Sequence, residues 1–296
     1  MMVRSKATMI RKAILTAAGL GTRLLPMTKE LPKEMLPIFM RDADGVLVLK
    51  PLLQVLFEQL YVFGVREFYF VVGRGKRSIE DHFTPDWDYV AKLESRGRHE
   101  LASMLRSFYE MVEDSVIVWV NQPMPKGFGH AVYMARALVG SEPFFVCAGD
   151  TYIISENNGF LRRMVEAYLR GGADAVLLLQ EVSDPRQYGV AVVEGVENGV
   201  YRVLRVVEKP REPPSRHAIM PYYIFNPVLM EVLDGLEAGV GGEIQLTDAI
   251  QRLIDTGKEV RAVLLHSDEI RLDVGTPETY WEALKLSYEY WTGVRK

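Results

Sequence analysis

A glycine-rich turn after the first apolar segment is the first feature that could bind a substrate. In AAGLGTRLLP (17–26), Gly19 and Gly21 come shortly before Arg23. Glycines let backbone amides approach a phosphate closely, and an arginine guanidinium can hold phosphate oxygens in a bidentate manner. Leu24 stands where a dinucleotide-binding fingerprint has its third glycine, and no P-loop lysine follows a suitable glycine run. The turn therefore indicates either a phosphate site of another kind or an ordinary connection between a strand and a loop.

A stiff loop that carries a lysine follows at LPKEMLPI (31–38). Pro32 and Pro37 bracket Lys33 and Glu34 and prevent a regular helix there. A lysine held in such a loop could place its ammonium over the same phosphates. The alternative is a solvated lysine on a proline-rich surface loop.

A carboxylate ends one of the apolar segments, FFVCAGD (144–150). Ligands of open α/β sheets bind at the carboxyl ends of the strands, so this position favours a ligand-binding role for Asp150. The alternative is a helix cap or a turn. The histidines show no metal-ligand spacing, and we expect His130, in GFGHAV, to have a structural role at the start of a helix.

The elements that must position these residues follow a regular order. Five apolar segments have the length of a strand: 13–19, 67–73, 116–120, 143–150 and 175–182. They are nearly continuous in apolar residues, which is typical of strands buried on both faces of a mainly parallel sheet. Three segments between them have helical apolar spacing and end at a glycine: 50–64, 129–140 and 160–172. We therefore expect an α/β fold, a three-layer α/β/α sandwich around a mainly parallel, Rossmann-like mixed central sheet.

Two regions depart from this alternation. The segment 83–114 is rich in charge and has apolar spacing for helices. From residue 188, two short alternating strands joined at 197–199 predict a hairpin, a small β subregion that would form a wall over the sheet. Because no repeat or linker is visible, we expect a single domain over 1–296.

The composition excludes several classes of protein. The chain has 296 residues, a net charge of −4 and a sequence pI near 5.8, so no basic field would draw it to nucleic acid. The single cysteine, Cys147, excludes an internal disulfide framework, and we expect it to be a buried small hydrophobe. The first apolar stretch is broken by glycine well before the roughly 20 residues of a membrane span. We expect a cytoplasmic protein that binds neither nucleic acid nor a membrane.

Several motifs, taken together, resemble those of one family. In chain order they include AAGLGTRLLPMTKELPKEMLP (17–37), GRGKRSIEDHF (73–83), KGFGHAV (126–132), EKP (208–210), GGEIQLTDAI (241–250) and RLDVGTPETY (271–280). The sequence is thereby similar to the bacterial-type UTP:glucose-1-phosphate uridylyltransferases from about residue 12 to residue 281. The PKEMLP and KGxGHA motifs distinguish it from the related thymidylyltransferases, which have a lysine-glutamine version of the first motif.

The resemblance implies a complete site. The nucleotide would be bound by Ala18, Gly19, Gly21, Thr22, Gln122 and Gly127. The catalytic residues would be Arg23, Lys33, Asp150 and Lys209. The sugar would be bound by Gly189, Glu208 and Lys209, and a Mg²⁺ ion by Asp150 and Asp273. Residues 12–187 would then be the mainly nucleotide-binding part of the domain, and 188–282 the sugar-binding and C-terminal part.

Two of these implied contacts can be checked against elementary chemistry. The Gln122 amide can accept a hydrogen bond from the imide N–H of uracil and donate one to its carbonyl, although a polar cap at the end of a strand is the alternative role. Glu208 and Lys209 are neighbours in a strand and would point to opposite faces. They can reach one ligand only if the strand ends or twists there, and Pro210 favours such an ending.

The implied reaction joins UTP and glucose 1-phosphate to give UDP-glucose and pyrophosphate. The nucleophile is a phosphate oxygen that is already anionic, so the reaction requires positioned cations and a metal rather than a general base. Two features depart from the family pattern: a longer segment at 39–51, which would only lengthen a loop, and a single aspartate in GDT (149–151), which leaves Asp150 as the sole ligand there and keeps use of dTTP open. The alternatives are a thymidylyltransferase or broader sugar-1-phosphate nucleotidyltransferase, a dinucleotide-dependent oxidoreductase and a non-catalytic binding protein. The family also suggests a homodimer or homotetramer.

Overall fold

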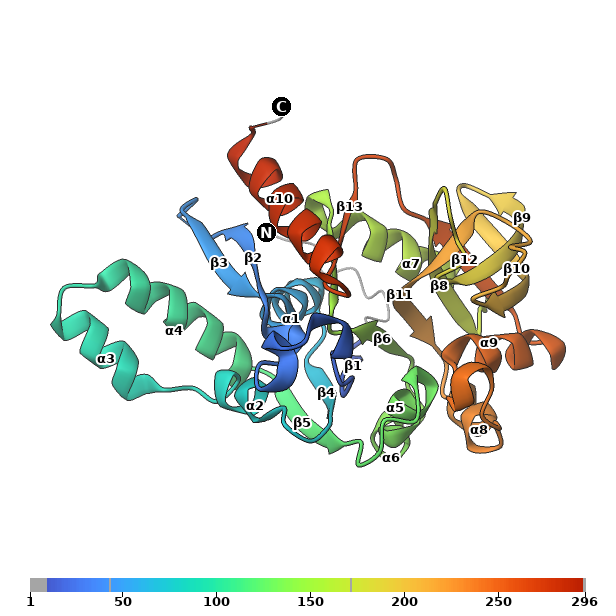
Figure 1. Ribbon diagram of the computed structural model, residues 1–296, viewed down its shortest axis with the longest axis horizontal. Helices are drawn as coiled ribbons and strands as arrows, with labels where there is room; N and C mark the ends of the chain where they lie inside the picture. Colours follow the sequence, from blue (N-terminus) through green and yellow to red (C-terminus); the bar gives the residue numbers. More distant parts are fainter. Residues whose placement is uncertain (1–9, 43, 171, 295–296) are drawn as a thin grey trace.

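A mixed sheet of nine strands crosses the molecule (Figure 1). The structure is a computed structural model that describes residues 10–42, 44–170 and 172–294. The strand order across the sheet is β5-β4-β1-β6-β11-β8-β12-β10-β9. These strands are β1 (Lys12–Ala17), β4 (Glu67–Val72), β5 (Val116–Asn121), β6 (Phe144–Ala148), β8 (Ala175–Glu181), β9 (Gly189–Glu197), β10 (Val200–Glu208), β11 (His217–Phe225) and β12 (Val260–Leu264). All five predicted strand segments form strands, namely β1, β4, β5, β6 and β8.

The N-terminal half of the sheet is parallel, as the continuous apolar segments predict. Strands β5, β4, β1 and β6 pair in parallel, and the neighbouring residues Ile14 and Leu15 of β1 are both fully buried although they point to opposite faces. Strand β5 differs from the prediction of burial on both faces. It lies at the edge of the sheet, so its side chains are only half-buried or exposed.

The other half of the sheet is largely antiparallel, which corrects the expectation of a mainly parallel sheet. Strand β11 runs antiparallel to both β6 and β8. The predicted hairpin is confirmed as β9–β10, and its turn residues Asn198 and Gly199 both have positive φ, 55° and 75°, as a tight hairpin turn requires. The hairpin does not form a separate wall over the sheet. Strand β9 also pairs with β11, so β11, β8, β12, β10 and β9 form a closed ring in which the edge of the hairpin is paired.

Helices cover both faces of the sheet. They are α1 (Leu52–Phe63), α2 (Arg77–His82), α3 (Trp87–Ser95), α4 (His99–Glu113), α5 (Phe128–Met134), α6 (Arg136–Val139), α7 (Gly159–Leu169), α8 (Val228–Asp234), α9 (Leu246–Asp255) and α10 (Pro277–Thr292). Helices α1, α4 and α7 pack into one buried cluster with Leu15, whereas α5, α8 and α9 pack into a second cluster with Ile14 on the other face. The predicted helix at 129–140 is divided between α5 and α6. Within the described residues, no helix is long and apolar enough to cross a bilayer.

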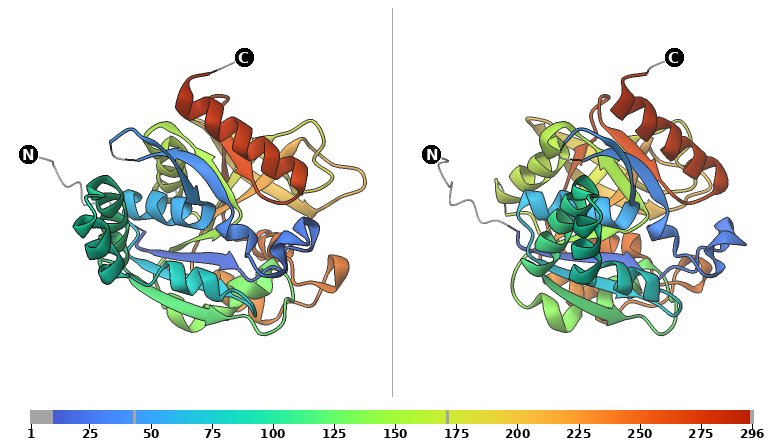
Figure 2. Two further views of the ribbon diagram at one scale, coloured as in Figure 1. Left: turned by 60° about the vertical axis from the view of Figure 1, so that its left-hand side comes forward. Right: turned by 90° about the vertical axis from the view of Figure 1, so that its left-hand side faces the viewer.

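Two small sheets and the last helix complete the fold. Strands β2 (Pro37–Arg41) and β3 (Leu47–Pro51) form one pair, and β7 (Thr151–Ile154) and β13 (Ile270–Asp273) form the other. Helix α10 packs on β2, where the Phe39 and Tyr288 rings meet edge to face at 5.2 Å, and it follows β13 directly (Figure 2). A third buried cluster joins these elements. The C-terminal segment is thereby attached to the N-terminal half, next to the ends of β1 and β6.

Candidate active site

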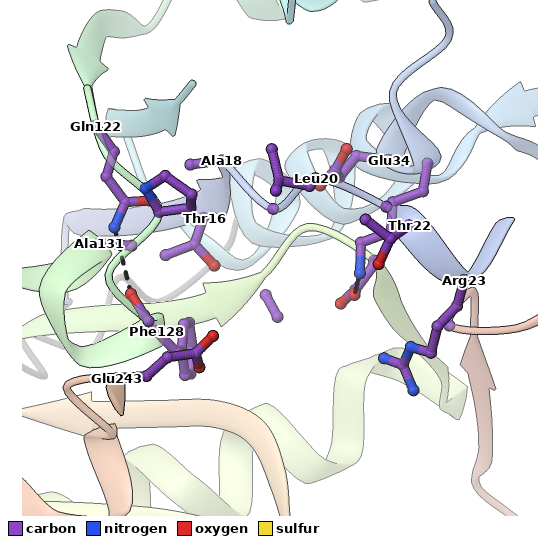
Figure 3. A pocket seen from close by; sticks show the side chains of 18 residues that line it. Thr16, Ala18, Leu20, Thr22, Arg23, Glu34, Gln122, Phe128, Ala131 and Glu243 are labelled. Atoms are coloured by element: carbon purple, nitrogen blue, oxygen red, sulfur yellow. Dashed lines mark hydrogen bonds and ion pairs between the residues drawn. The ribbon is translucent and has the colours of Figure 1, made fainter. Parts of the chain in front are cut away.

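A cavity of about 430 Å³ opens at the carboxyl ends of β1, β5 and β6 (Figure 3). Its wall is formed by segments far apart in the sequence, including the glycine turn, the proline-bracketed loop and the start of α5. The predicted site residues on this wall are Ala18, Gly19, Gly21, Thr22, Arg23, Lys33, Gln122, Gly127 and Asp150. The other predicted residues, Gly189, Glu208, Lys209 and Asp273, lie outside the wall of this cavity.

The glycine turn forms the end of the cavity opposite Gln122 (Figure 3). Gly21 has a φ of +66°, and a Cβ atom there would lie 3.1 Å from Cβ of Thr28. The Thr28 hydroxyl donates to the Gly21 carbonyl at 2.7 Å and holds the turn in place. Next in the chain, the Arg23 side chain is exposed, and it has no hydrogen bond or ion pair with any residue that the structure describes. Its guanidinium donors are therefore available to an anion in the cavity.

The proline-bracketed loop brings Lys33 to Asp150. The loop forms only a 3₁₀ turn, Lys33–Met35, and the Lys33 ammonium makes an ion pair with Asp150, 117 positions away in the chain. Burial by itself would lower the pKa of Lys33, but the Asp150 carboxylate, with smaller contributions from Glu34 and Asp273, outweighs this and holds that pKa above its usual range. Burial would raise the pKa of Asp150, yet Lys33 lowers it overall. Both groups are therefore charged at neutral pH.

Strand pairing places Asp273 beside Asp150. In the β7–β13 pair, Asp273 is the partner of Thr151, the residue that follows Asp150. Burial and the Asp150 carboxylate together raise the pKa of Asp273. Two carboxylates that repel each other in this way fit a divalent cation, which would relieve the repulsion. The described part of the chain contains no cluster of three or more His, Cys, Asp or Glu side chains with metal-binding geometry, so a metal here would depend on these two carboxylates and on oxygens of its ligand.

Gln122 lies at the other end of the cavity and is almost fully buried, with 4% of its surface exposed. Its Nε2 donates to the Gly127 carbonyl at 3.3 Å and to Nδ1 of His130 at 2.9 Å. Gly127 has a φ of +100°, and a Cβ atom there would lie 2.7 Å from the Ile244 carbonyl oxygen. Burial, with smaller contributions from nearby cations, lowers the pKa of His130, which keeps its ring neutral. Its structural role at the start of α5 therefore includes a direct contact with a predicted site residue.

The three predicted sugar-binding residues lie together where β10 ends. Glu208 is the last residue of the strand and pairs with Gly189 across the hairpin. Lys209 then adopts a φ of +40°, and its ammonium lies 3.1 Å from the Glu208 carboxylate. Neighbours in a regular strand would point to opposite faces, but the strained backbone at Lys209 brings the Glu208 and Lys209 side chains together. The Thr247 hydroxyl, from α9, donates to Glu208 at 2.7 Å. Sequence reasoning missed Thr247, although it lies in the GGEIQLTDAI motif.

A buried ion pair next to Lys33 was also missed. The Glu34 carboxylate accepts from the Lys76 ammonium at 2.8 Å, and the two side chains are 2% and 8% exposed. Burial raises the pKa of Glu34 despite the ammonium beside it. The proline-bracketed loop and the GRGK segment contain these residues, but no spacing in the sequence relates one to the other. Phe128 and Glu243, which line the cavity, were missed as well and also lie within the quoted motifs.

Comparisons with known proteins identify the family of this chain. A family model described as nucleotidyl transferase matches residues 12–289. The chain is 38% identical to UTP–glucose-1-phosphate uridylyltransferase of Bacillus subtilis, over 90% of this chain and 87% of that protein. It is 36% identical to the protein of the same name from Pseudomonas aeruginosa, over 96% and 99%. Among solved structures, a UDP-glucose pyrophosphorylase complexed with UDP-glucose is 35% identical, with a TM-score of 0.81, and covers 95% of this chain and all of its own. A UTP-bound enzyme of that type from Acinetobacter baumannii is 30% identical, with a TM-score of 0.82 over 95% and 94% of the two chains.

Proposed function

The chain belongs to the nucleotidyl transferase family, and we propose that it transfers the uridylyl group of UTP to glucose 1-phosphate, giving UDP-glucose and pyrophosphate. The observation that carries this proposal is one cavity that brings together an arginine without a partner among the described residues, a half-buried lysine–aspartate pair and a buried glutamine. The names of the relatives support the same substrates. In this proposal, residues 12–187 form the mainly nucleotide-binding part, and 188–282 form the sugar-binding and C-terminal part.

The nucleotide would lie along the cavity from Gln122 to Arg23. Gln122 and Gly127 would contact the base, and Ala18 and Gly19 would flank it. The backbone of Gly21 and Thr22 would meet the triphosphate. Because the Arg23 guanidinium has no competing partner in the described protein, it can neutralise the phosphates that leave as pyrophosphate.

Glucose 1-phosphate would approach from the end of β10. Glu208 and Gly189 would bind the sugar hydroxyls, and the Lys209 ammonium would hold the phosphate in line with the α-phosphorus. A phosphate oxygen of the sugar attacks this phosphorus while the bond to pyrophosphate breaks, so no proton has to be removed first. Lys33 would neutralise charge that develops at the α-phosphate. These residues contribute alignment and fixed positive charge rather than acid–base chemistry.

Asp150 and Asp273 would hold a Mg²⁺ ion, which would supply further positive charge at the reacting phosphates. The donor set suits this metal, because Mg²⁺ is commonly bound through one or two carboxylates together with phosphate oxygens. Asp273 is the informative residue, since its raised pKa means that folding disfavours its charged form. Functional sites often contain a carboxylate whose charged form destabilises the fold and is stabilised only when the ligand binds.

The experiment measures pyrophosphate release with glucose 1-phosphate and each of UTP, dTTP, CTP and GTP, with and without Mg²⁺. We expect turnover with UTP that stops on chelation and returns with Mg²⁺. Asp273→Asn should lower kcat roughly 100-fold or more while Tm stays the same or rises. Asp184→Asn, at an exposed carboxylate paired with Arg186, is the control and should change neither. Absence of turnover with UTP would overturn the proposed reaction, and normal kcat in Asp273→Asn would overturn the metal assignment.

A further inference from the structure

The Gln122 amide is almost completely committed to contacts within the protein. Its nitrogen carries two N–H donors, and the structure provides two acceptors for them, the Gly127 carbonyl at 3.3 Å and His130 Nδ1 at 2.9 Å. No hydrogen bond to Oε1 of Gln122 is present within the described ranges of the chain. The oxygen is therefore the one part of the amide that is still available, and Gln122 lies on the wall of the cavity.

The surroundings decide which way the amide points. A carbonyl oxygen can only accept, so the Gly127 carbonyl requires the NH₂ side of Gln122 and would repel Oε1. Since the NH₂ side of Gln122 also faces Nδ1 of His130, this nitrogen has to be the unprotonated one of the ring, because only an unprotonated nitrogen can accept. Burial lowers the pKa of His130, and a neutral ring leaves Nδ1 free to accept. The Gly127 carbonyl thus sets the orientation of the amide, and His130 matches it as the tautomer that is unprotonated at Nδ1.

We propose that His130 is a specificity-determining positioning residue: by accepting from Gln122 Nε2, it leaves the amide oxygen as the only group that Gln122 offers to a base. This inference rests on the proposed function, in which Gln122 meets the base of the nucleotide. An oxygen acceptor pairs with a pyrimidine that has an N–H at ring position 3, as uracil and thymine have. It repels a pyrimidine with a lone pair at that position, as cytosine has.

This assignment differs in one respect from the role that the sequence predicts for Gln122. An amide in isolation could accept from the imide N–H and donate to the neighbouring carbonyl of uracil. Here both donors of the Gln122 amide are used within the protein, so Gln122 itself distinguishes bases by its amide oxygen alone. A binding site with a fixed polar group discriminates strongly against a ligand that leaves the group unpaired or faces it with a like group.

The experiment compares the binding of UTP, dTTP and CTP by calorimetry in the wild type and in two variants of His130. His130→Leu removes the shorter of the two contacts of Gln122 Nε2 and frees one N–H, so that only the 3.3 Å contact with the Gly127 carbonyl opposes a turn of the amide that offers a donor to cytosine. We expect the preference for UTP over CTP, as a ratio of Kd values, to fall about tenfold or more. His130→Asn can place a carbonyl oxygen near the position of Nδ1 and should keep the ratio within about threefold of wild type. The same comparison by kcat/KM provides a second measurement.

Tyr133→Phe is the matched control, because it lies one turn along the same helix and its hydroxyl contacts Asp234 rather than Gln122. It should leave the ratio unchanged. Thermal unfolding of each variant shows whether it is folded, and His130→Ala replaces His130→Leu if the latter is not.

An unchanged UTP-to-CTP ratio in the variant without an acceptor would overturn this inference, and so would equal losses in His130→Leu and His130→Asn. A wild type that binds UTP and CTP equally would overturn it as well. The proposed function fails by a different result, namely absence of pyrophosphate release from UTP and glucose 1-phosphate. Because binding is measured without turnover, the two failures are distinguishable.

Discussion

Replacement of Lys76 by methionine would leave the Glu34 carboxylate buried without its partner. The two groups are 2.8 Å apart, and their side chains are 2% and 8% exposed, so water cannot take the place of the ammonium. The stem of Glu34 also lies against Gly149, where a Cβ atom would be 3.3 Å from Cγ of Glu34. The carboxylate therefore has little room to turn toward solvent.

Removal of one member of a buried ion pair is expected to lower the free energy of unfolding by about 3–5 kcal/mol. For a chain of this size, such a loss corresponds to a decrease in Tm of roughly 5–10 °C. Replacement of both charges by methionine, Glu34→Met with Lys76→Met, should recover most of the loss, to within about 1 kcal/mol of wild type, because a well-packed apolar pair is often as stable as a buried ion pair.

The loss in Lys76→Met should also depend on pH in a defined direction. Burial already raises the pKa of Glu34 with Lys76 present, and the pKa should rise further without it. A carboxyl with a raised pKa in the folded state favours folding when it is protonated, and this contribution disappears as the pH rises through that pKa. Lys76→Met should therefore be destabilised less at pH 5 than at pH 8.

The assay is urea unfolding followed by circular dichroism, for the wild type, both single variants and the double variant. Lys50→Met is the control, since the Lys50–Glu58 pair has a similar length of 2.7 Å but is 15% and 16% exposed. It should lose about 1 kcal/mol or less, as a more solvated pair does. The reasoning is refuted if Lys76→Met loses no more than the control, or if the losses of the two single variants simply add in the double variant.

Two further predictions concern the pH dependence of stability and the base end of the cavity. Burial lowers the pKa of His82 from 6.5 to about 4, so the folded state excludes a proton that the unfolded chain binds, and stability should fall by up to about 3 kcal/mol as the pH decreases from 7 to 4. Urea unfolding should show a flatter profile in His82→Gln, which keeps a contact with Gln54 but does not titrate; equal profiles would contradict the assignment. Gly127→Ala combines a positive φ with a contact of 2.7 Å to the Ile244 carbonyl, so it should lower stability by about 1–3 kcal/mol and raise KM for UTP. Gly97→Ala has a positive φ with open space around it, so it should lose less stability and leave KM unchanged, and equal effects would show that the contact is unimportant.

The strands and turns whose formation depends only on residues close together in the chain were predictable from the sequence. Continuous apolar runs indicated β1, β4, β6 and β8, because a strand buried on both faces has no polar position to interrupt it. The turn at Asn198 and Gly199 was predictable, since these residue types adopt positive φ readily. The glycine turn and the strand-end position of Asp150 pointed to one edge of the sheet, where the cavity is found.

The pairing of distant segments was not predictable from such patterns. Nothing in the residues around Asp273 shows that β13 pairs with β7, yet this pairing places it beside Asp150. The closed ring around β11 and β9 likewise depends on how a twisted sheet closes on itself, so the sheet was expected to be more parallel than it is.

The sequence alone thus determined which segments form strands, helices and tight turns, and which residue types are available for phosphate chemistry. Only the tertiary structure decided which of them meet. It gave Glu34 its partner Lys76 and turned the Gln122 amide so that its oxygen remains available. The physical reason is that periodicity and backbone preference act between neighbours along the chain, whereas the orientation and charge of a buried polar group depend on partners that folding brings from elsewhere in the sequence.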